Sequence, residues 1–244
     1  MTGEKGFLII RGVQPMVNIH IIERPDGNFI PQFSMKLRYS AAPFWIWIAS
    51  KHRDQSLVAG NEIAAVWDTS DADNRARMLE SELSSCSQTI VSLAIAWESF
   101  QKVIADSIRS TKDVKASWKK NRKSAAKKIT QTMELAFDLK KETGGQLHSH
   151  LSALFRLRNM VVHPSAEFAD PVWRDDVRSY VSPVFAELFA ERVNHFFSDS
   201  LHFFWMIANQ PKSANRHVDD HRNSLRVRLL EQFPNLPDVF PSPG

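Results

Sequence analysis

The chain has 244 residues, of which 43% are hydrophobic and 24% are charged, and its formal net charge is +4. These values are typical of a globular protein and exclude a disordered or fibrous chain. The longest apolar runs, such as residues 43–49, are far shorter than the roughly 18 residues of a membrane span. The apolar patch at residues 7–10 is too short for a secretory signal, so we expect a cytoplasmic protein with no membrane partner.

Residues 1–70 are predicted to form a small β-rich element. Two segments of alternating apolar residues flank the sequence Pro-Asp-Gly-Asn at residues 25–28, which is a strong turn signal and predicts an N-terminal hairpin. The apolar run at residues 43–50 adds either a third strand or a buried helix, and its pattern alone does not decide between them.

Helical periodicity dominates residues 71–210. Ser70, Asp71 and Asp73 are candidate N-caps for one helix of about 35 residues, or two in tandem. The pair Gly144 and Gly145 is expected to end the helix after that. Three further segments complete the chain: a polar loop at 170–176, a long helix at 183–208, and a polar helix with a proline-punctuated tail at 211–244.

This pattern predicts a mainly α protein, a bundle of about four or five helices with a small N-terminal β-hairpin. The helix predicted at residues 183–208 is apolar over more than one face, which indicates burial on both sides or a subunit interface. The single Cys86 cannot form an internal disulfide, and its helical context predicts a small buried residue.

Basic residues gather at residues 112–128, where eight of them stand against one acid. Such a run could follow a phosphate backbone while a tryptophan stacks on a base, or it could be a solvated helix face or an exposed linker. The residues expected to bind nucleic acid are Lys115, Trp118, Lys119, Lys120, Arg122, Lys123 and Lys127.

A second candidate site is the sequence RLRNMVVHP, in which Pro164 ends a helix. Asn159 and His163 are one turn apart on the same face, and Arg158 lies about 140° around the helix from His163. A long arginine can still reach that face. Alternatively, His163 only interacts with the negative end of the helix dipole and Arg158 only bridges two helices.

An arginine, a polar residue and a histidine in this arrangement, at the end of a helix late in a bundle, resemble the defining motif of the HEPN superfamily. Arg158, Asn159 and His163 match its three positions, and the resemblance covers roughly residues 75–208 by architecture. It implies a HEPN-like helical bundle and a metal-independent endoribonuclease of the kind found in defence or toxin systems. Glu98, in the segment AIAWESF, resembles an acid that some members direct toward the motif.

The resemblance also implies roles and partners. His163 would move a proton, Arg158 would bind phosphate, and Asn159 would orient the histidine or hold a phosphate oxygen. Because one histidine does not conveniently serve as base and acid in the same step, a homodimer with a composite site is expected. RNA is the expected substrate, and an antitoxin or another protein is a further partner that the resemblance allows.

No metal or cofactor is expected. The eight glycines form no phosphate-cradling loop, and the histidines at residues 217 and 221 lack an indicated third ligand for zinc. The alternative to the enzyme is a non-catalytic helical module of the same fold that binds RNA or a protein partner.

Overall fold

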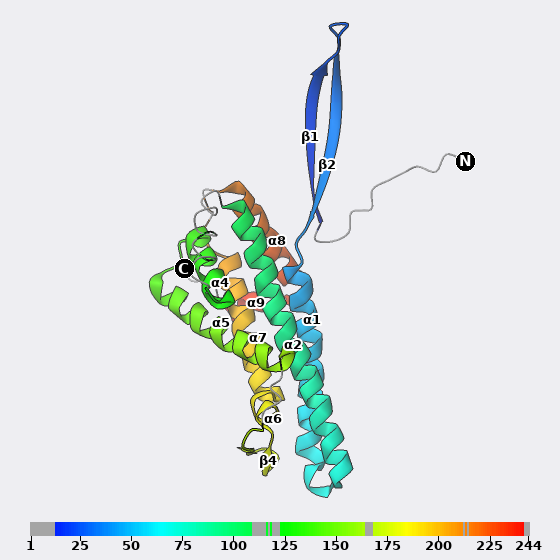
Figure 1. The fold of residues 1–244 in the computed structure, drawn as a ribbon, viewed down its shortest axis with the longest axis vertical. Coiled ribbons are helices and arrows are strands. Elements are labelled where there is room, and N and C mark those ends of the chain that lie inside the picture. Colours follow the sequence, from blue (N-terminus) through cyan, green and yellow to red (C-terminus); the bar gives the residue numbers. More distant parts are fainter. Residues whose placement is uncertain are drawn as a thin grey trace, which may run out of the picture. The chain divides into compact units, whose positions relative to one another are not determined.

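The computed structural model describes residues 13–108, 116, 118, 123–163, 168–211, 213 and 215–241. Its contacts divide the chain into two units, one ending at Ala41 and one beginning at Ala42 (Figure 1). The first unit contains a two-stranded hairpin, and the second is helical apart from a short hairpin of its own. The protein is therefore mainly helical with a small N-terminal β-hairpin, as the sequence predicts.

The N-terminal hairpin pairs β1 (Val13–Glu23) with β2 (Phe29–Tyr39) in antiparallel register. Its turn is closed by the amide of Arg24, which donates to the carbonyl of Asn28 at 2.8 Å. Gly27 has a φ of 79°, a conformation that glycine adopts without a steric penalty. The predicted turn and hairpin are confirmed.

The described residues of the second unit form eight α-helices, where the sequence predicts four or five. The helices are α1 (Ala42–Val66), α2 (Ala72–Ser107), α4 (Ala125–Phe137), α5 (Lys141–Val162), α6 (Pro183–Glu187), α7 (Ala190–Ala208), α8 (Arg216–Gln232) and α9 (Leu236–Val239). The other elements are a 3-10 turn at Trp67–Thr69 and the strands β3 (Val172–Arg174) and β4 (Ser179–Val181).

Helix α1 decides between the two predicted possibilities for residues 43–50 and corrects the placement of residues 42–70 in the β-rich element. Ala42, Ile46 and Ala49 recur at three- and four-residue steps and are all buried, which is a helical pattern. Helix α1 packs along α2, so residues 42–70 belong with the helices and not with the hairpin. The pattern of this short run was ambiguous because Phe44 and Trp47, which face outward from α1, are also apolar, so the run shows no polar face.

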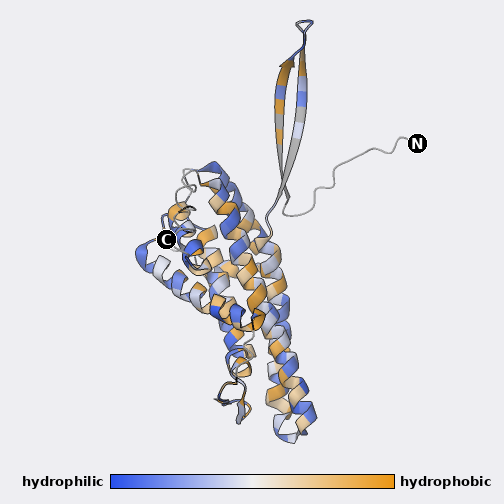
Figure 2. Cartoon of the chain, in the orientation of Figure 1, coloured by the Kyte–Doolittle hydropathy of each residue, from blue (hydrophilic) through white to orange (hydrophobic). Residues whose placement is uncertain are grey.

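Helix α2 is a single helix of 36 residues, which decides between the two predicted possibilities. Its N-cap is Asp71, whose Oδ1 accepts a hydrogen bond from the amide of Asn74 at 2.8 Å. Polar and apolar residues alternate along α2 and its neighbours in Figure 2, as expected for helices that bury one side.

The pair Gly144 and Gly145 does not end a helix. Helix α4 already ends at Asp138, which has a φ of 47°, and both glycines lie in the first turns of α5. A Cβ atom at Gly144 would meet the side chain of Glu134 on α4, and this flexible carboxylate would have to shift. The glycine signal here does not reflect a break in the chain.

The helix predicted at residues 183–208 is interrupted between α6 and α7. The amide of Ala190, in the first turn of α7, donates to Oε1 of Glu82 on α2 at 2.9 Å. A buried carboxylate thus satisfies an amide that has no partner within its own helix and marks the start of α7.

Two segments without predicted regular structure, the polar loop at 170–176 and the proline-punctuated tail, contain a strand and a short helix. The polar segment at 170–176 contributes β3 and the turn to β4, and the tail folds back as α9 with Leu236 buried in the core.

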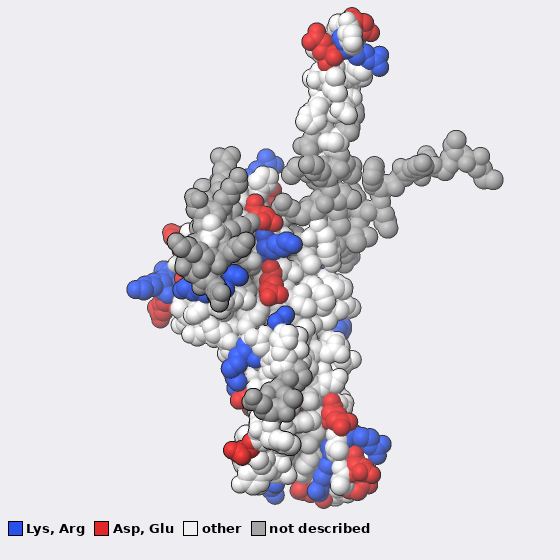
Figure 3. All heavy atoms as spheres, viewed as in Figure 1, with Lys and Arg blue, Asp and Glu red and all other residues white. Residues whose placement is uncertain are grey.

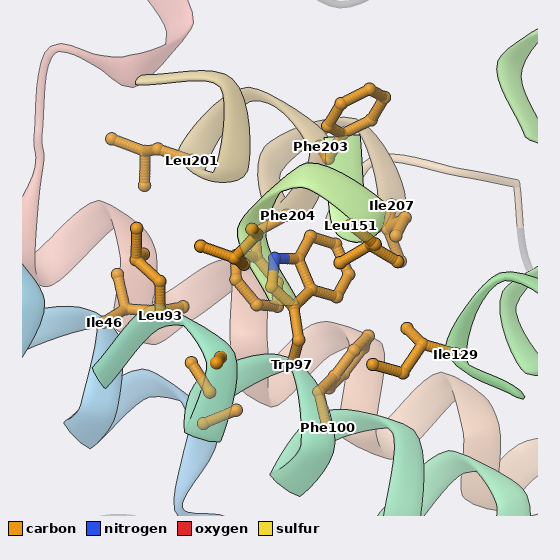
Figure 4. Packing of buried hydrophobic residues seen from close by; sticks show 14 of the residues in the cluster. Ile46, Leu93, Trp97, Phe100, Ile129, Leu151, Leu201, Phe203, Phe204 and Ile207 are labelled. Atoms are coloured by element: carbon orange, nitrogen blue, oxygen red, sulfur yellow. The ribbon is translucent and has the colours of Figure 1, made fainter. Parts of the chain in front are cut away.

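The hydrophobic core is built around α7, which contacts α1, α2, α5 and α8. The indole of Trp97 on α2 stacks on Phe204 of α7 with ring centroids 3.8 Å apart, and Phe100 meets the same ring edge-on (Figure 4). Burial on several sides accounts for the broad apolar surface of α7, so this surface does not require a subunit interface.

A buried charge network ties β3 to the helices. Arg174 and Glu82 are only 4% and 1% exposed, and their Nη2 and Oε2 atoms lie 2.7 Å apart. Arg174 also donates from Nε and Nη2 to both carboxylate oxygens of Asp176, and from Nη1 to the carbonyl of Phe185. Burial raises the pKa of Glu82, and the positive charge of Arg174 opposes that rise.

We expect Arg174→Met to lower the free energy of unfolding by about 3–5 kcal/mol, because it leaves the Glu82 carboxylate buried without a counter-charge. Urea unfolding monitored by circular dichroism measures this change. The double variant Glu82→Gln/Arg174→Met should lose less, and Arg178→Met, which changes an exposed arginine of the same hairpin, should lose little. Equal stability of Arg174→Met and wild type would contradict the role of the network.

A second polar network crosses the core at His150 of α5. Its Nε2 lies 2.8 Å from Oγ of Ser200, and the same hydroxyl accepts a hydrogen bond from Nε1 of Trp97 at 3.4 Å. Burial lowers the pKa of His150 to about 4, while the charge of Asp199 acts in the opposite direction. The histidine is therefore neutral in the folded protein at neutral pH.

The His150 network predicts a loss of stability in mild acid. The unfolded chain binds a proton at His150 below its ordinary pKa of about 6.5, and the folded protein binds it only near pH 4. The free energy of unfolding therefore has its full value above about pH 6.5. About 2 kcal/mol of it is lost between pH 7 and pH 5, because over this range only the unfolded chain takes up the proton. Urea titrations at both pH values should show a smaller loss in His150→Gln than in wild type. Identical pH dependence in the two proteins would disprove this assignment.

Candidate active site

The predicted motif lies at the end of α5. Leu147, Leu151 and Leu154 bury one side of this helix in the core, and His163 follows its last residue as the C-cap. The next residue in the sequence is Pro164, which cannot continue a helix and explains the end at this point. The predicted helix end is confirmed.

The structure brings the three motif residues together on accessible surface. Nη1 of Arg158 donates to Oδ1 of Asn159 at 3.1 Å, and the amide of His163 donates to the carbonyl of Asn159 at 2.8 Å. Arg158 is half-buried, and both Asn159 and His163 are exposed. The second bond is the backbone hydrogen bond that closes the last turn of α5, so only the side chains of Arg158 and Asn159 are joined directly. The guanidinium of Arg158 and the imidazole of His163 both lie on accessible surface.

Two further arginines lie near this end of α5, and sequence reasoning missed both as candidates. Arg156 and Arg192 pair with Oε2 of Glu187 at 2.8 and 3.0 Å. Arg156 lies seven residues before His163, so the two share a helix face. The sequence spacing could therefore have identified Arg156 as a candidate. Arg192 belongs to α7, and only the packing of the helices brings it to Glu187.

These arginines give the end of α5 a local excess of positive charge. Among the described residues, Arg156 and Arg192 share one ion-pair partner, Glu187, and the side chain of Arg156 is 51% exposed. Arg158 adds a positive charge two residues further along α5, on another side of the helix. On the visible face of the helical unit as a whole, acidic and basic residues are interspersed (Figure 3). Attraction of an anion is thus a property of this end of α5, where forked guanidinium donors suit phosphate oxygens.

Glu98 is not brought to the motif. It is exposed on α2 beside Trp97, which meets Ser200 and His150 in the core network. His163 lies thirteen residues beyond His150 along α5, a distance of about 20 Å at 1.5 Å per residue. The described residues include no hydrogen bond or ion pair between Glu98 and the motif, so its expected role at the site is not supported by its position.

The basic run is described only in part. Lys115, Lys119, Lys120 and Arg122 lie outside the described residues. Trp118 is 6% exposed, and its Nε1 donates to Oε1 of Gln131 on α4 at 2.8 Å. Its ring packs against the protein and does not offer a stacking surface for a base, which corrects the expectation for this residue.

Two lysines of the run are described at the start of α4. Nζ of Lys123 donates to Oε1 of Gln131 at 3.2 Å, and the backbone amide of Lys127 donates to Oγ of the N-cap Ser124. Both lysines are half-buried. Lys123 shares its acceptor with the indole of Trp118.

Cys86 does not offer a reactive thiolate. It is fully buried in α2, and burial raises the pKa of its thiol to about 12. In the described ranges, no three side chains of histidine, cysteine, aspartate or glutamate are grouped as metal ligands.

No known protein family, curated protein or solved structure matches the chain. Within the part of the chain that the structure describes, none of the helices combines the length and apolar composition needed to cross a membrane.

Proposed function

We propose that this protein is a metal-independent endoribonuclease of the HEPN type, with Arg158, Asn159 and His163 as its site. The observation that supports this most is their placement at the exposed end of α5, where Oδ1 of Asn159 accepts from Arg158 and His163 follows as the C-cap. A mainly helical chain agrees with the fold of that superfamily. The local excess of arginine adds a reason for a polyanion to bind here.

The proposed reaction is attack of the RNA 2′-oxygen on the adjacent phosphorus. A bond forms between that oxygen and phosphorus, the bond to the 5′-oxygen breaks, and a 2′,3′-cyclic phosphate results. His163 takes the proton from the 2′-hydroxyl or gives a proton to the leaving 5′-oxygen. Arg158 stabilises the charge that develops on the phosphoryl oxygens, and Asn159 holds its guanidinium in place.

A homodimer completes this scheme, because the base and the acid act in the same step and each subunit offers one motif histidine. Val162 is 43% exposed and Phe168 is fully exposed, and both lie within five residues of His163. Such apolar side chains beside a polar site suit coverage by a second subunit. A defence or toxin setting, with an antitoxin or another partner protein, belongs to the same proposal.

The second candidate is a non-catalytic module of the same fold that binds RNA or a protein partner. It needs no acid beside the motif, and the described residues show no hydrogen bond or ion pair between Glu98 and the three motif residues. The exposed arginines would bind RNA in either case. The two functions differ in whether RNA is cut.

We expect the purified wild-type protein to cleave a labelled structured RNA in excess EDTA. Arg158→Ala and His163→Ala should each lower the rate by at least about 100-fold, because each removes a group used in the transition state. Gel electrophoresis measures the rate, and detection of 2′,3′-cyclic phosphate ends identifies the chemistry. The matched controls are Arg226→Ala and His217→Ala, which change exposed residues of α8.

The same experiment separates the two candidate functions. If no protein cuts RNA while all of them bind it with strong salt dependence, the binding module replaces the enzyme. Cleavage that survives His163→Ala in a folded protein would remove the catalytic assignment.

We also expect Arg156→Ala to weaken RNA binding and to reduce the slope of log Kd against log salt concentration by about 1, because one phosphate contact is lost. Fluorescence anisotropy over a series of salt concentrations measures the slope. Arg226→Ala should leave it unchanged. A normal slope in Arg156→Ala would exclude that arginine from the RNA contact.

A further inference from the structure

A cleft of about 500 Å³ lies within the helical unit, where α1, α2, the β3–β4 hairpin and the start of α7 meet. Asn61 of α1 and Asn194 of α7 contribute amide groups to its wall. Glu82 and Arg174 line it as well, so the buried charge network also borders an accessible space. A concave site with convergent polar groups is the usual form of a small-molecule binding site.

The cleft is strongly negative. Its lining includes one arginine and four acids, which are Glu82, Asp175, Asp176 and Glu191. Arg174 is already held by Glu82 and by both carboxylate oxygens of Asp176. The remaining negative charge repels phosphate, so the cleft does not continue the RNA surface at the end of α5 and instead favours a cation.

Two of the acids have accessible carboxylates. Both Asp175 and Glu191 are exposed. Oδ1 of Asp175 accepts a hydrogen bond from Nε1 of Trp173 at 2.8 Å, which leaves its other oxygen open. Glu191 stands in the first turn of α7, where the helix dipole favours an acid, and its carboxylate has no hydrogen bond or ion pair with any described residue.

An aromatic ring completes the lining. Trp173 is 48% exposed, and it packs edge-on against Tyr180 across the β3–β4 hairpin with ring centroids 5.2 Å apart. The hairpin is itself fixed by Arg174, so the indole is held beside the cleft. Asp175 lies at the edge of the indole, where Nε1 donates to it, and does not cover the ring face. Carboxylates recognise ammonium and guanidinium groups through charge, and an exposed indole face adds a cation–π interaction.

We propose that this cleft binds an organic cation that carries an amine or guanidinium group. Asp175 and Glu191 bind its charged nitrogen atoms, Trp173 contacts it through the ring, and the amide oxygen of Asn61 accepts a hydrogen bond from it. The amide oxygen of Asn194 already accepts from Nη1 of Arg53 at 3.1 Å, so Asn194 lines the cleft without serving as a free acceptor. The cation is either a free small molecule or a lysine or arginine side chain of another protein. This site is separate from the motif at the end of α5 and does not depend on RNA cleavage.

Isothermal titration calorimetry of the full chain tests the site with spermidine and agmatine as free cations. The blocked tripeptides Gly-Lys-Gly and Gly-Arg-Gly represent basic side chains. We expect saturable binding of at least one of these probes and none of sorbitol, a neutral polyol. Asp175→Asn and Glu191→Gln should each weaken binding about fivefold, as expected for loss of one partly exposed charge pair.

Both variants should keep the fold, so a loss of binding reports the loss of a carboxylate charge. Asp175→Asn retains an oxygen that can accept from Trp173, and Glu191 makes no contact that its replacement would break, so both should fold. Glu62→Gln, at an exposed acid of α1 outside the cleft, is the control and should bind like wild type. Binding of the free cations, or of the tripeptides alone, identifies the source of the ligand. Absence of binding, or binding that Asp175→Asn and Glu191→Gln leave unchanged, overturns the proposal.

Discussion

The buried pairing of Glu82 with Arg174 is the constraint on which much of the helical unit depends. An unpaired charge in a protein interior costs several kcal/mol, so the elements that carry this pair are held together. Glu82 fixes the start of α7 through the amide of Ala190, and Arg174 fixes the β3–β4 hairpin and reaches the carbonyl of Phe185 in α6. One carboxylate on α2 thus positions three later elements of the chain.

The two proposed sites lie on either side of α6 and the start of α7, and their charges are opposite. At the end of α5, Arg156 and Arg192 meet at Glu187 of α6 beside the motif. In the cleft, Asp175 and Glu191 face open space next to Trp173. Charge separation over so short a stretch of structure favours two distinct ligands, an anion at the motif and a cation in the cleft.

Much of the local structure could be predicted from the sequence. The turn at Gly27, the N-cap at Asp71 and the helix end before Pro164 follow from local sterics and from hydrogen bonds between near neighbours. The sequence left a choice open, or misled, where a short pattern fits two structures. The apolar run that begins α1 fits a strand as well as a helix, and the glycines at 144 and 145, which suggested a helix end, lie in the first turns of α5.

The sequence by itself determined the mainly helical class, the N-terminal hairpin and the spacing of Arg158, Asn159 and His163, because these depend on residues close together in the chain. Tertiary structure alone decided that Trp118 packs against Gln131 and that Arg192 joins Arg156 at Glu187. The sequence did not predict the cleft either. Its carboxylates come from separate elements, and long-range burial of Glu82 and Arg174 brings those elements together.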